Sequence, residues 1–198
     1  MTTLVVGASG ATGRLLVQQL LQRGEHVRVI VRSKESLPEE IASSDAVSII
    51  QASVLDLSDD EMIRHVGGCN AIASCLGHNL SFKGMFLPPR RLVTDATRRL
   101  CNAAKANEPL YPVKFVLMNT TGNRNRDLNE QVSTRQKFVI GLIRLLLPPH
   151  ADNEDSAEYL RTDYGQNVGT IQWAVVRPYS MIDEAEPTEI SVQPSPTR

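Results

Sequence analysis

The chain has 198 residues, of which 41% are hydrophobic and 22% are charged, so it is long enough to bury one hydrophobic core. Its 21 basic and 22 acidic residues give a formal net charge of −1 and form no long block of either sign. This charge pattern excludes the basic surface of a nucleic-acid-binding protein and the polybasic tail of a membrane-bound one. We expect a single domain, residues 1–198, that recognises a small molecule or another protein.

The cysteines and the apolar segments predict a cytoplasmic protein. Cys69, Cys75 and Cys101 lack the paired spacing of a metal or redox site, which favours buried thiols in a reducing compartment. The first residues enter an apolar run without the basic region of a secretory signal. The longest apolar run, residues 138–147, is too short to span a bilayer and contains Arg144.

The first third of the chain predicts a strand, a helix and a second strand. Residues 4–6 are a compact apolar run, and four leucines between residues 15 and 21 then recur at helical spacing. Gly24 stands where a helix would end, and residues 26–31 predict the second strand. The βαβ unit is therefore complete by Arg32.

Strands and helices continue to alternate along the rest of the chain. We predict strands over 47–50, 71–75, 113–118 and 171–176, a short helix starting at the acidic cluster 59–61, and helices over 92–104, 136–147 and 154–164. This order requires a doubly wound α/β fold with a mostly parallel sheet of six or more strands and helices on both faces. The Pro- and Ser-rich tail 184–198 predicts loop or edge structure, and no repeat or linker divides the chain.

The strongest motif is Gly7-x-x-Gly10-x-x-Gly13, between the first strand and the first helix. Glycines there permit a tight turn and a close approach of the backbone to a pyrophosphate, while the helix N-terminus offers N–H groups and partial positive charge. The spacing departs from Gly-x-Gly-x-x-Gly, and a merely tight turn is the alternative. The strand-turn-helix context favours a dinucleotide site of Rossmann type.

The end of the second strand predicts which dinucleotide is preferred. An acidic side chain there would bind the ribose 2′-hydroxyl of NAD, but this chain has Arg32 followed by Ser33. A guanidinium pairs with a 2′-phosphate through charge-assisted hydrogen bonds. We therefore expect NADP (NADPH) rather than NAD, with an ordinary exposed arginine as the alternative.

Three loops should line the nicotinamide half, because open α/β sheets bind ligands at the carboxyl ends of their strands. These loops contain Ser9, residues 75–78 and residues 119–122. Thr120 and Thr121 could hydrogen-bond a substrate carbonyl or could satisfy only backbone groups of their own loop. Both interpretations stay open.

Together with residues 157–161 and 176–178, these motifs resemble the atypical short-chain dehydrogenase/reductase superfamily, in particular its NmrA-like NAD(P)H-binding group, which includes flavin and biliverdin reductases. The resemblance covers nearly the whole chain, with gaps at 77–90 and 122–150. It implies that the pyrophosphate is held by Gly7, Ser9, Gly10, Ala11, Thr12 and Gly13. It also implies that the 2′-phosphate contacts Arg32 and Ser33.

The resemblance implies further contacts along the sheet edge. Adenine would lie by Ser53 and Val54, the ribose and pyrophosphate by Cys75, Leu76 and Gly77, and the nicotinamide by Asn119, Thr120, Pro178 and Tyr179. Ser53 stands where the family usually has Asp, which is a departure from the pattern at the adenine contact.

The superfamily's catalytic Tyr-x-x-x-Lys pair is missing, and its two places hold His150 and Glu154. His150 could donate a proton to a substrate, with Glu154 orienting its ring, or it could be a loop histidine without a catalytic role. Thr120 and His150 are thus the candidate catalytic residues. No metal site is expected.

Two functions from different classes follow. The first is an NADPH-dependent oxidoreductase that transfers a hydride to a small electron-poor or carbonyl acceptor lying among Thr120, His78, Phe82, Phe86 and His150. The second, favoured by the missing Tyr and Lys, is a non-catalytic NADP(H)-binding sensor or scaffold that regulates a partner protein. Sugar-nucleotide epimerase or dehydratase chemistry ranks last, because it needs that pair and a longer C-terminal substrate domain.

The C-terminal region is expected to be short on the substrate side. Family members usually continue past residues 194–196 into another strand and helix, whereas this sequence stops at Arg198. The pocket would then be open, or completed by a partner subunit, and we expect a monomer or a homodimer.

Overall fold

The computed structural model describes most of the chain, and the account below is restricted to that part. The described residues are 1–78, 87–120, 122–123, 125–128, 130, 133–135, 141–142, 144, 147–165, 169–178, 181 and 189–194.

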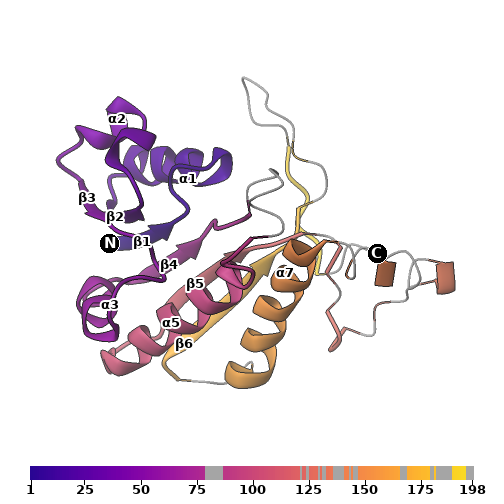
Figure 1. Cartoon of the computed structure of the whole chain (residues 1–198). Coiled ribbons are helices and arrows are strands. Elements are labelled where there is room, and N and C mark those ends of the chain that lie inside the picture. The colour runs from indigo at the N-terminus through magenta and orange to yellow at the C-terminus, as the bar shows by residue number, and fades with distance from the viewer. Residues whose placement is uncertain are drawn as a thin grey trace.

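Six strands form one sheet in the order β3-β2-β1-β4-β5-β6, and all neighbouring strands are parallel (Figure 1). The strands are β1 Thr2–Val6, β2 His26–Val31, β3 Val47–Gln51, β4 Ala71–Ser74, β5 Val113–Met118 and β6 Ile171–Val176. The order reverses between β1 and β4, which is the point at which doubly wound sheets bind ligands. The predicted Rossmann-type fold class is therefore confirmed.

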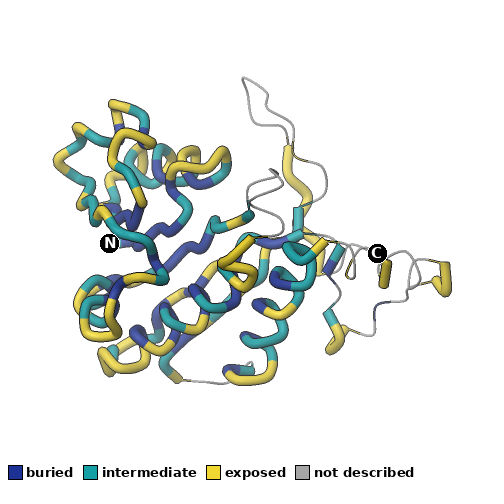
Figure 2. The backbone as a smooth tube through the Cα atoms, in the orientation of Figure 1, coloured by how far each residue is buried: buried dark blue, intermediate teal, exposed yellow. Residues whose placement is uncertain are grey.

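The helices cover the two faces of the sheet in two groups (Figure 1). They are α1 Ala11–Gln22, α2 Glu39–Ala42, α3 Asp59–Val66, α5 Leu92–Ala106 and α7 Pro148–Tyr159, with short turns η1 Lys34–Ser36 and η2 Leu160–Tyr164. α1 and α2 lie on one face, and α3, α5 and α7 lie on the other. Figure 2 shows the buried segments running along the strands and the inner sides of these helices.

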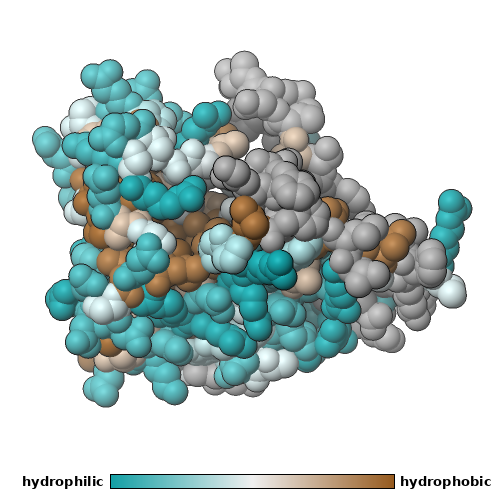
Figure 3. All heavy atoms as spheres, in the orientation of Figure 1, coloured by the Kyte–Doolittle hydropathy of each residue, from teal (hydrophilic) through white to brown (hydrophobic). Residues whose placement is uncertain are grey.

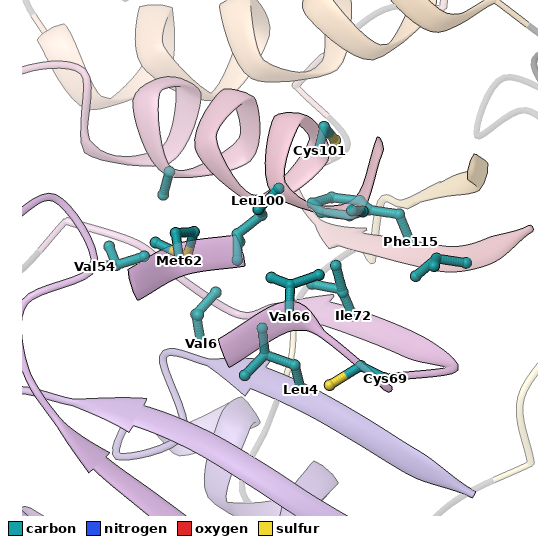
Figure 4. Close-up of a cluster of buried hydrophobic side chains, with 14 of the residues drawn as sticks. Leu4, Val6, Val54, Met62, Val66, Cys69, Ile72, Leu100, Cys101 and Phe115 are labelled. Atoms are coloured by element: carbon teal, nitrogen blue, oxygen red, sulfur yellow. The ribbon is translucent and has the colours of Figure 1, made fainter. Parts of the chain in front are cut away.

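The core consists of two clusters, one on each face, because successive side chains of a strand point in opposite directions. In β1, Leu4 and Val6 pack in the larger cluster with Leu100 and Phe115 (Figure 4), whereas Val5 packs in the smaller cluster under α1. In Figure 3, hydrophobic residues gather between the more hydrophilic outer helices.

Local signals set the ends of the first helices. α1 ends just before Gly24 (φ +73°), where the N–H groups of Gly24 and Glu25 donate to the carbonyls of Leu21 and Leu20. α3 begins with a capping box in which Ser58 and Glu61 bond each other's backbone N–H. The predicted role of Gly24 and the predicted start of α3 are both confirmed.

The last helix differs from the sequence prediction. α7 begins at Pro148 rather than Glu154, because proline is favourable in the first helical turn, where its missing N–H would have no partner. His150 therefore lies in a helix and not in a loop. Most of the predicted helix 136–147 lies outside the described residues.

Candidate dinucleotide site

The turn between β1 and α1 is too tight for side chains at two of its glycines. Gly7 has a φ of +78°, and a Cβ on it would lie 2.4 Å from the Cys75 carbonyl oxygen. A Cβ on Gly13 would lie 2.1 Å from the Gly7 carbonyl oxygen. Gly10 is different, because it is exposed and, among the described residues, the only neighbour of a Cβ there would be the Gly7 carbonyl oxygen at 3.3 Å, a tight contact but not an overlap. Packing thus requires Gly7 and Gly13, while Gly10 leaves the outer side of the turn bare.

The N-terminus of α1 is open to an anion. The first helical hydrogen bond runs from Arg14 N to Gly10 O (3.0 Å), and Gly10 provides no side-chain cap. The first turn contains no acidic residue, and Ser9 and Ala11 are exposed beside it. Amides in this position attract phosphate groups through direct hydrogen bonds and through the helix dipole.

The end of β2 carries an unpaired cation. Arg32 is exposed and forms no hydrogen bond or ion pair within the described part of the chain. The Ser33 hydroxyl donates a 2.5 Å hydrogen bond to Glu35, and this bond lowers the pKa of the Glu35 carboxyl. Glu35 was not anticipated from the sequence, and it places a carboxylate two residues from the expected 2′-phosphate contact.

At the predicted adenine end, the two residues differ in burial. Val54 is 6% exposed and packs in the larger core cluster (Figure 4), so its side chain faces the protein interior. Ser53 is half-buried, and its hydroxyl accepts a hydrogen bond from Leu55 N at 3.4 Å.

The structure brings the ends of β1 and β4 together, as the sheet order requires. Cys75 N donates to the Val6 carbonyl (2.9 Å), and the Cys75 carbonyl faces Gly7. Burial raises the pKa of the Cys75 thiol from 9.0 to about 11, so the thiol is neutral. Leu76 packs against the core and Gly77 is exposed, which leaves backbone at this edge for a ligand.

Asn119 anchors the end of β5 to α7. Its backbone N–H donates to Val176 O (2.8 Å), and its side-chain amide donates to Asn153 O (2.9 Å). Its side-chain oxygen accepts hydrogen bonds from Thr120 N and from the Asn123 amide. This network fixes the backbone on which Thr120 sits.

Thr120 and His150 both lie close to Gly122. A Cβ built on Gly122 would be 2.9 Å from His150 Cε1 and 3.8 Å from Thr120 Oγ1. The His150 side chain is 13% exposed, and its Nε2 lies 3.7 Å from Glu154 Oε1 without a hydrogen bond. A buried nitrogen without a partner calls for a ligand or a water molecule.

A sequence model of proteins described as NAD(P)H-binding matches residues 7–198. The chain belongs to this NAD(P)H-binding family. No curated protein sequence matches the chain.

Solved structures with this fold come from several organisms. A putative NAD-dependent epimerase/dehydratase from Bacillus halodurans has 17% identity and a TM-score of 0.70, over 98% of this chain and 78% of its own. The oxidoreductase ylbE from Lactococcus lactis has 18% identity and a TM-score of 0.64, over 93% and 71%. The UDP-glucose 4-epimerase from Thermus thermophilus, in complex with NAD, has 20% identity and a TM-score of 0.62, over 89% and 54%.

These comparisons confirm the resemblance to the atypical short-chain dehydrogenase/reductase superfamily and the NAD(P)H-binding class. At such identities the solved structures show the fold alone. Within the described ranges, no helix is long and apolar enough to cross a membrane. The same residues include no cluster of three or more side chains arranged to hold a metal ion.

The family's catalytic region contains one buried carboxylate that sequence analysis missed. Asp152 in α7 is 1% exposed and accepts hydrogen bonds from His78 Nε2 (2.8 Å), Val93 N (2.8 Å) and Thr94 N (3.0 Å). It therefore caps α5 from another helix. The sequence indicated this role of Asp152 only indirectly. Arg91, which precedes α5, has no side chain that can cap the helix, so the first backbone N–H groups of α5 needed an acceptor from elsewhere in the chain.

A second missed feature is a buried ion pair beyond β6. Arg177 donates to Glu130 (2.8 Å) and to the Asn123 carbonyl (2.8 Å), and its side chain is 11% exposed against 3% for Glu130. The pair ties the segment after β5 to the end of β6. Pro178 is half-buried beside it, whereas Thr121, Tyr179, Phe82 and Phe86 lie outside the described residues.

Proposed function

We propose that the protein binds NADP(H) at the turn between β1 and α1 and acts as an oxidoreductase of the NmrA-like group. The observation that carries the proposal is the exposed, bare Gly10 beside uncapped helical amides. Packing excludes side chains at Gly7 and Gly13, whereas a Cβ on Gly10 would meet only the Gly7 carbonyl oxygen among the described atoms, at 3.3 Å; a closely approaching pyrophosphate supplies a further reason for glycine there. The three free thiols suit a reducing cytoplasmic compartment.

The exposed and unpaired Arg32 supports NADP over NAD. A 2′-phosphate there would form charge-assisted hydrogen bonds with the guanidinium, whereas the ribose 2′-hydroxyl of NAD would gain little from it. The Glu35 carboxylate accepts a hydrogen bond from Ser33, the residue after Arg32, and a negative charge there would weaken the preference for a 2′-phosphate.

Calorimetric titration with NADPH and NADH tests the cofactor preference. The parent protein should bind NADPH at least about tenfold more tightly than NADH, and Arg32→Asp should reverse that order. Arg23→Asp is the matched control, because Arg23 is also exposed but lies at the opposite end of α1. Equal affinities in the parent protein would contradict the preference for NADP.

When bound, the cofactor supplies the hydride. The chain's own contribution is to orient an acceptor and to provide a proton. The Thr120 hydroxyl and the His150 ring, through Cε1 and Nδ1, both lie close to Gly122, so a carbonyl group that reaches this loop would meet a hydroxyl and an imidazole. Glu154 lies close enough to orient the imidazole.

The second candidate function is a non-catalytic NADP(H) sensor, favoured by the absence of the Tyr-x-x-x-Lys pair. Steady-state oxidation of NADPH with free flavins, quinones and biliverdin as acceptors distinguishes the two. Turnover that falls at least about tenfold in His150→Gln, with NADPH affinity unchanged, supports the enzyme. Clear NADPH binding without turnover on any acceptor supports the sensor.

A further inference from the structure

The loop after β4 is held at both of its ends. At the first end, Cys75 N donates a hydrogen bond to the Val6 carbonyl of β1 (2.9 Å). At the other end, His78 Nε2 lies 2.8 Å from Asp152 Oδ2 of α7. Because a carboxylate only accepts hydrogen bonds, Nε2 carries the hydrogen and donates it. Gly77 lies between the two ends; it is exposed, and no described atom lies within 4 Å of where its Cβ would be.

The anchor on α7 is itself fixed. Asp152 is 1% exposed and also accepts hydrogen bonds from Val93 N (2.8 Å) and Thr94 N (3.0 Å) at the start of α5. The Thr94 hydroxyl donates to the Asp152 carbonyl (3.0 Å), so the side chain and the backbone of Asp152 are both held. Only 5% of the His78 side chain is exposed, so water competes little for its hydrogen bond. The bond therefore ties the loop to α5 and α7.

This loop adjoins the proposed cofactor site. The sheet order reverses between β1 and β4, and the loops that follow these two strands share one edge. The two loops are in contact, because a Cβ on Gly7 would lie 2.4 Å from the Cys75 carbonyl oxygen. The end of β2, which Arg32 follows, is separated from β4 by β1. A displacement of the loop would thus alter the site beside β4 and leave the end of β2 in place.

We propose that His78 is a positioning residue for the cofactor, because its hydrogen bond to Asp152 holds the backbone at Gly77 in place for the diphosphate and nicotinamide half of NADP(H). The inference rests on the proposed function. Without this bond, the backbone between Cys75 and His78 gains conformational freedom, and the loss of that freedom on binding costs affinity. The adenosine half binds away from this loop, so its affinity should not change.

Two amide substitutions isolate the contribution of the hydrogen bond. In His78→Gln, the amide nitrogen lies as many bonds from Cα as the imidazole Nε2, so it can still donate to Asp152. In His78→Asn, the amide nitrogen is one bond closer to Cα and falls short of the carboxylate. His78→Asn should weaken NADPH binding at least about tenfold, and His78→Gln should stay within about threefold of the parent protein.

Adenosine 2′,5′-bisphosphate is the reference probe, because it contains the 2′-phosphate but lacks the nicotinamide half of NADPH. Calorimetric titration should give bisphosphate affinities within about twofold of each other for the parent protein and both variants. A role in stability alone would lower Tm in thermal unfolding but would leave the ratio of the NADPH and bisphosphate affinities unchanged. His26→Asn is the matched control, at an exposed position where β2 begins, and should keep both parent affinities.

Three results would overturn the inference: an equal loss of NADPH affinity in His78→Gln and His78→Asn, an equal loss for both probes, or no loss in a folded His78→Asn. His78→Ala removes the donor without leaving a buried amide unpaired, and it carries the test if His78→Asn does not fold. Failure of the parent protein to bind NADPH would instead refute the proposed function, and this inference with it.

Discussion

Replacing Asp152 with alanine removes the one carboxylate that joins three parts of the candidate site. It accepts hydrogen bonds from Val93 N and Thr94 N at the start of α5 and from His78 Nε2 after β4. Val93 and Thr94 are 0% exposed, so water cannot easily replace the lost acceptor. We expect Asp152→Ala to destabilise the fold.

The expected loss is large for a single substitution. Removing a helix cap costs about 1 kcal/mol, and each buried donor left without its acceptor costs about 1–3 kcal/mol. These effects overlap at one side chain, so we expect about 3–5 kcal/mol in total. For a chain of this size, each kcal/mol lowers Tm by about 2–4 °C, which gives a decrease of about 6–20 °C.

Thermal unfolding followed by circular dichroism measures the effect. Asp155→Ala is the matched control on the same helix, because Asp155 forms one 3.5 Å ion pair with Arg91 and both side chains are about half exposed. Such a pair contributes about 0–1 kcal/mol. Asp152→Asn keeps one acceptor oxygen and should fall between the two alanine variants. A decrease for Asp152→Ala no greater than that for Asp155→Ala would refute the reasoning.

Three further predictions concern the turn, a thiol and the buried ion pair. Gly10→Ala should weaken NADPH binding at least about tenfold and lower Tm only slightly, because its Cβ would lie 3.3 Å from the Gly7 carbonyl oxygen. Gly13→Ala should unfold at a much lower temperature, because its Cβ would lie 2.1 Å from the same oxygen. Calorimetric titration and thermal unfolding check both. With a pKa of about 11, Cys75 should react with iodoacetamide about tenfold faster per unit of pH between 7 and 9, as mass spectrometry can follow. Because the unfolded thiol ionises first, near its ordinary pKa of 9.0, the contribution of Cys75 to stability is complete below about pH 9 and is lost as the pH rises toward 11. Arg177→Met should cost about 3 kcal/mol in urea unfolding by removing the guanidinium that neutralises the buried Glu130 carboxylate, and adding Glu130→Gln should recover part of this loss.

The sequence predicted the sheet well because local patterns determine it. Val113–Met118 and Ile171–Val176 were located to the residue, since each is an apolar strand bounded by loop residues. The sharing of one sheet edge by the loops after β1 and β4 was also predicted, because the alternating order of elements requires parallel strands whose carboxyl ends lie together.

The long-range hydrogen bonds and ion pairs that hold the candidate site together could not be predicted in the same way. Asp152 bonds amides 58 and 59 residues away, and Arg177 pairs with a glutamate 47 residues away. Such contacts depend on how helices pack, which no local pattern encodes. The start of α7 was missed for a local reason, because two adjacent prolines were interpreted as a break when they open the helix.

The resemblance to the superfamily predicts that Glu154 stands at the position of the lysine in the catalytic pair, but a glutamate cannot do what a lysine does there. A carboxylate neither lowers the pKa of a phenol nor attracts the cofactor's phosphates, and this one is paired with Arg144. Cofactor affinity must then come from the α1 turn and Arg32. We therefore expect Glu154→Gln to leave the NADPH dissociation constant within about twofold in a calorimetric titration, while turnover falls because His150 loses its orienting partner. If Glu154→Gln weakened NADPH binding as strongly as Gly10→Ala, the cofactor would have to contact α7. The proposal that the α1 turn binds the cofactor while α7 provides the proton donor would then be wrong.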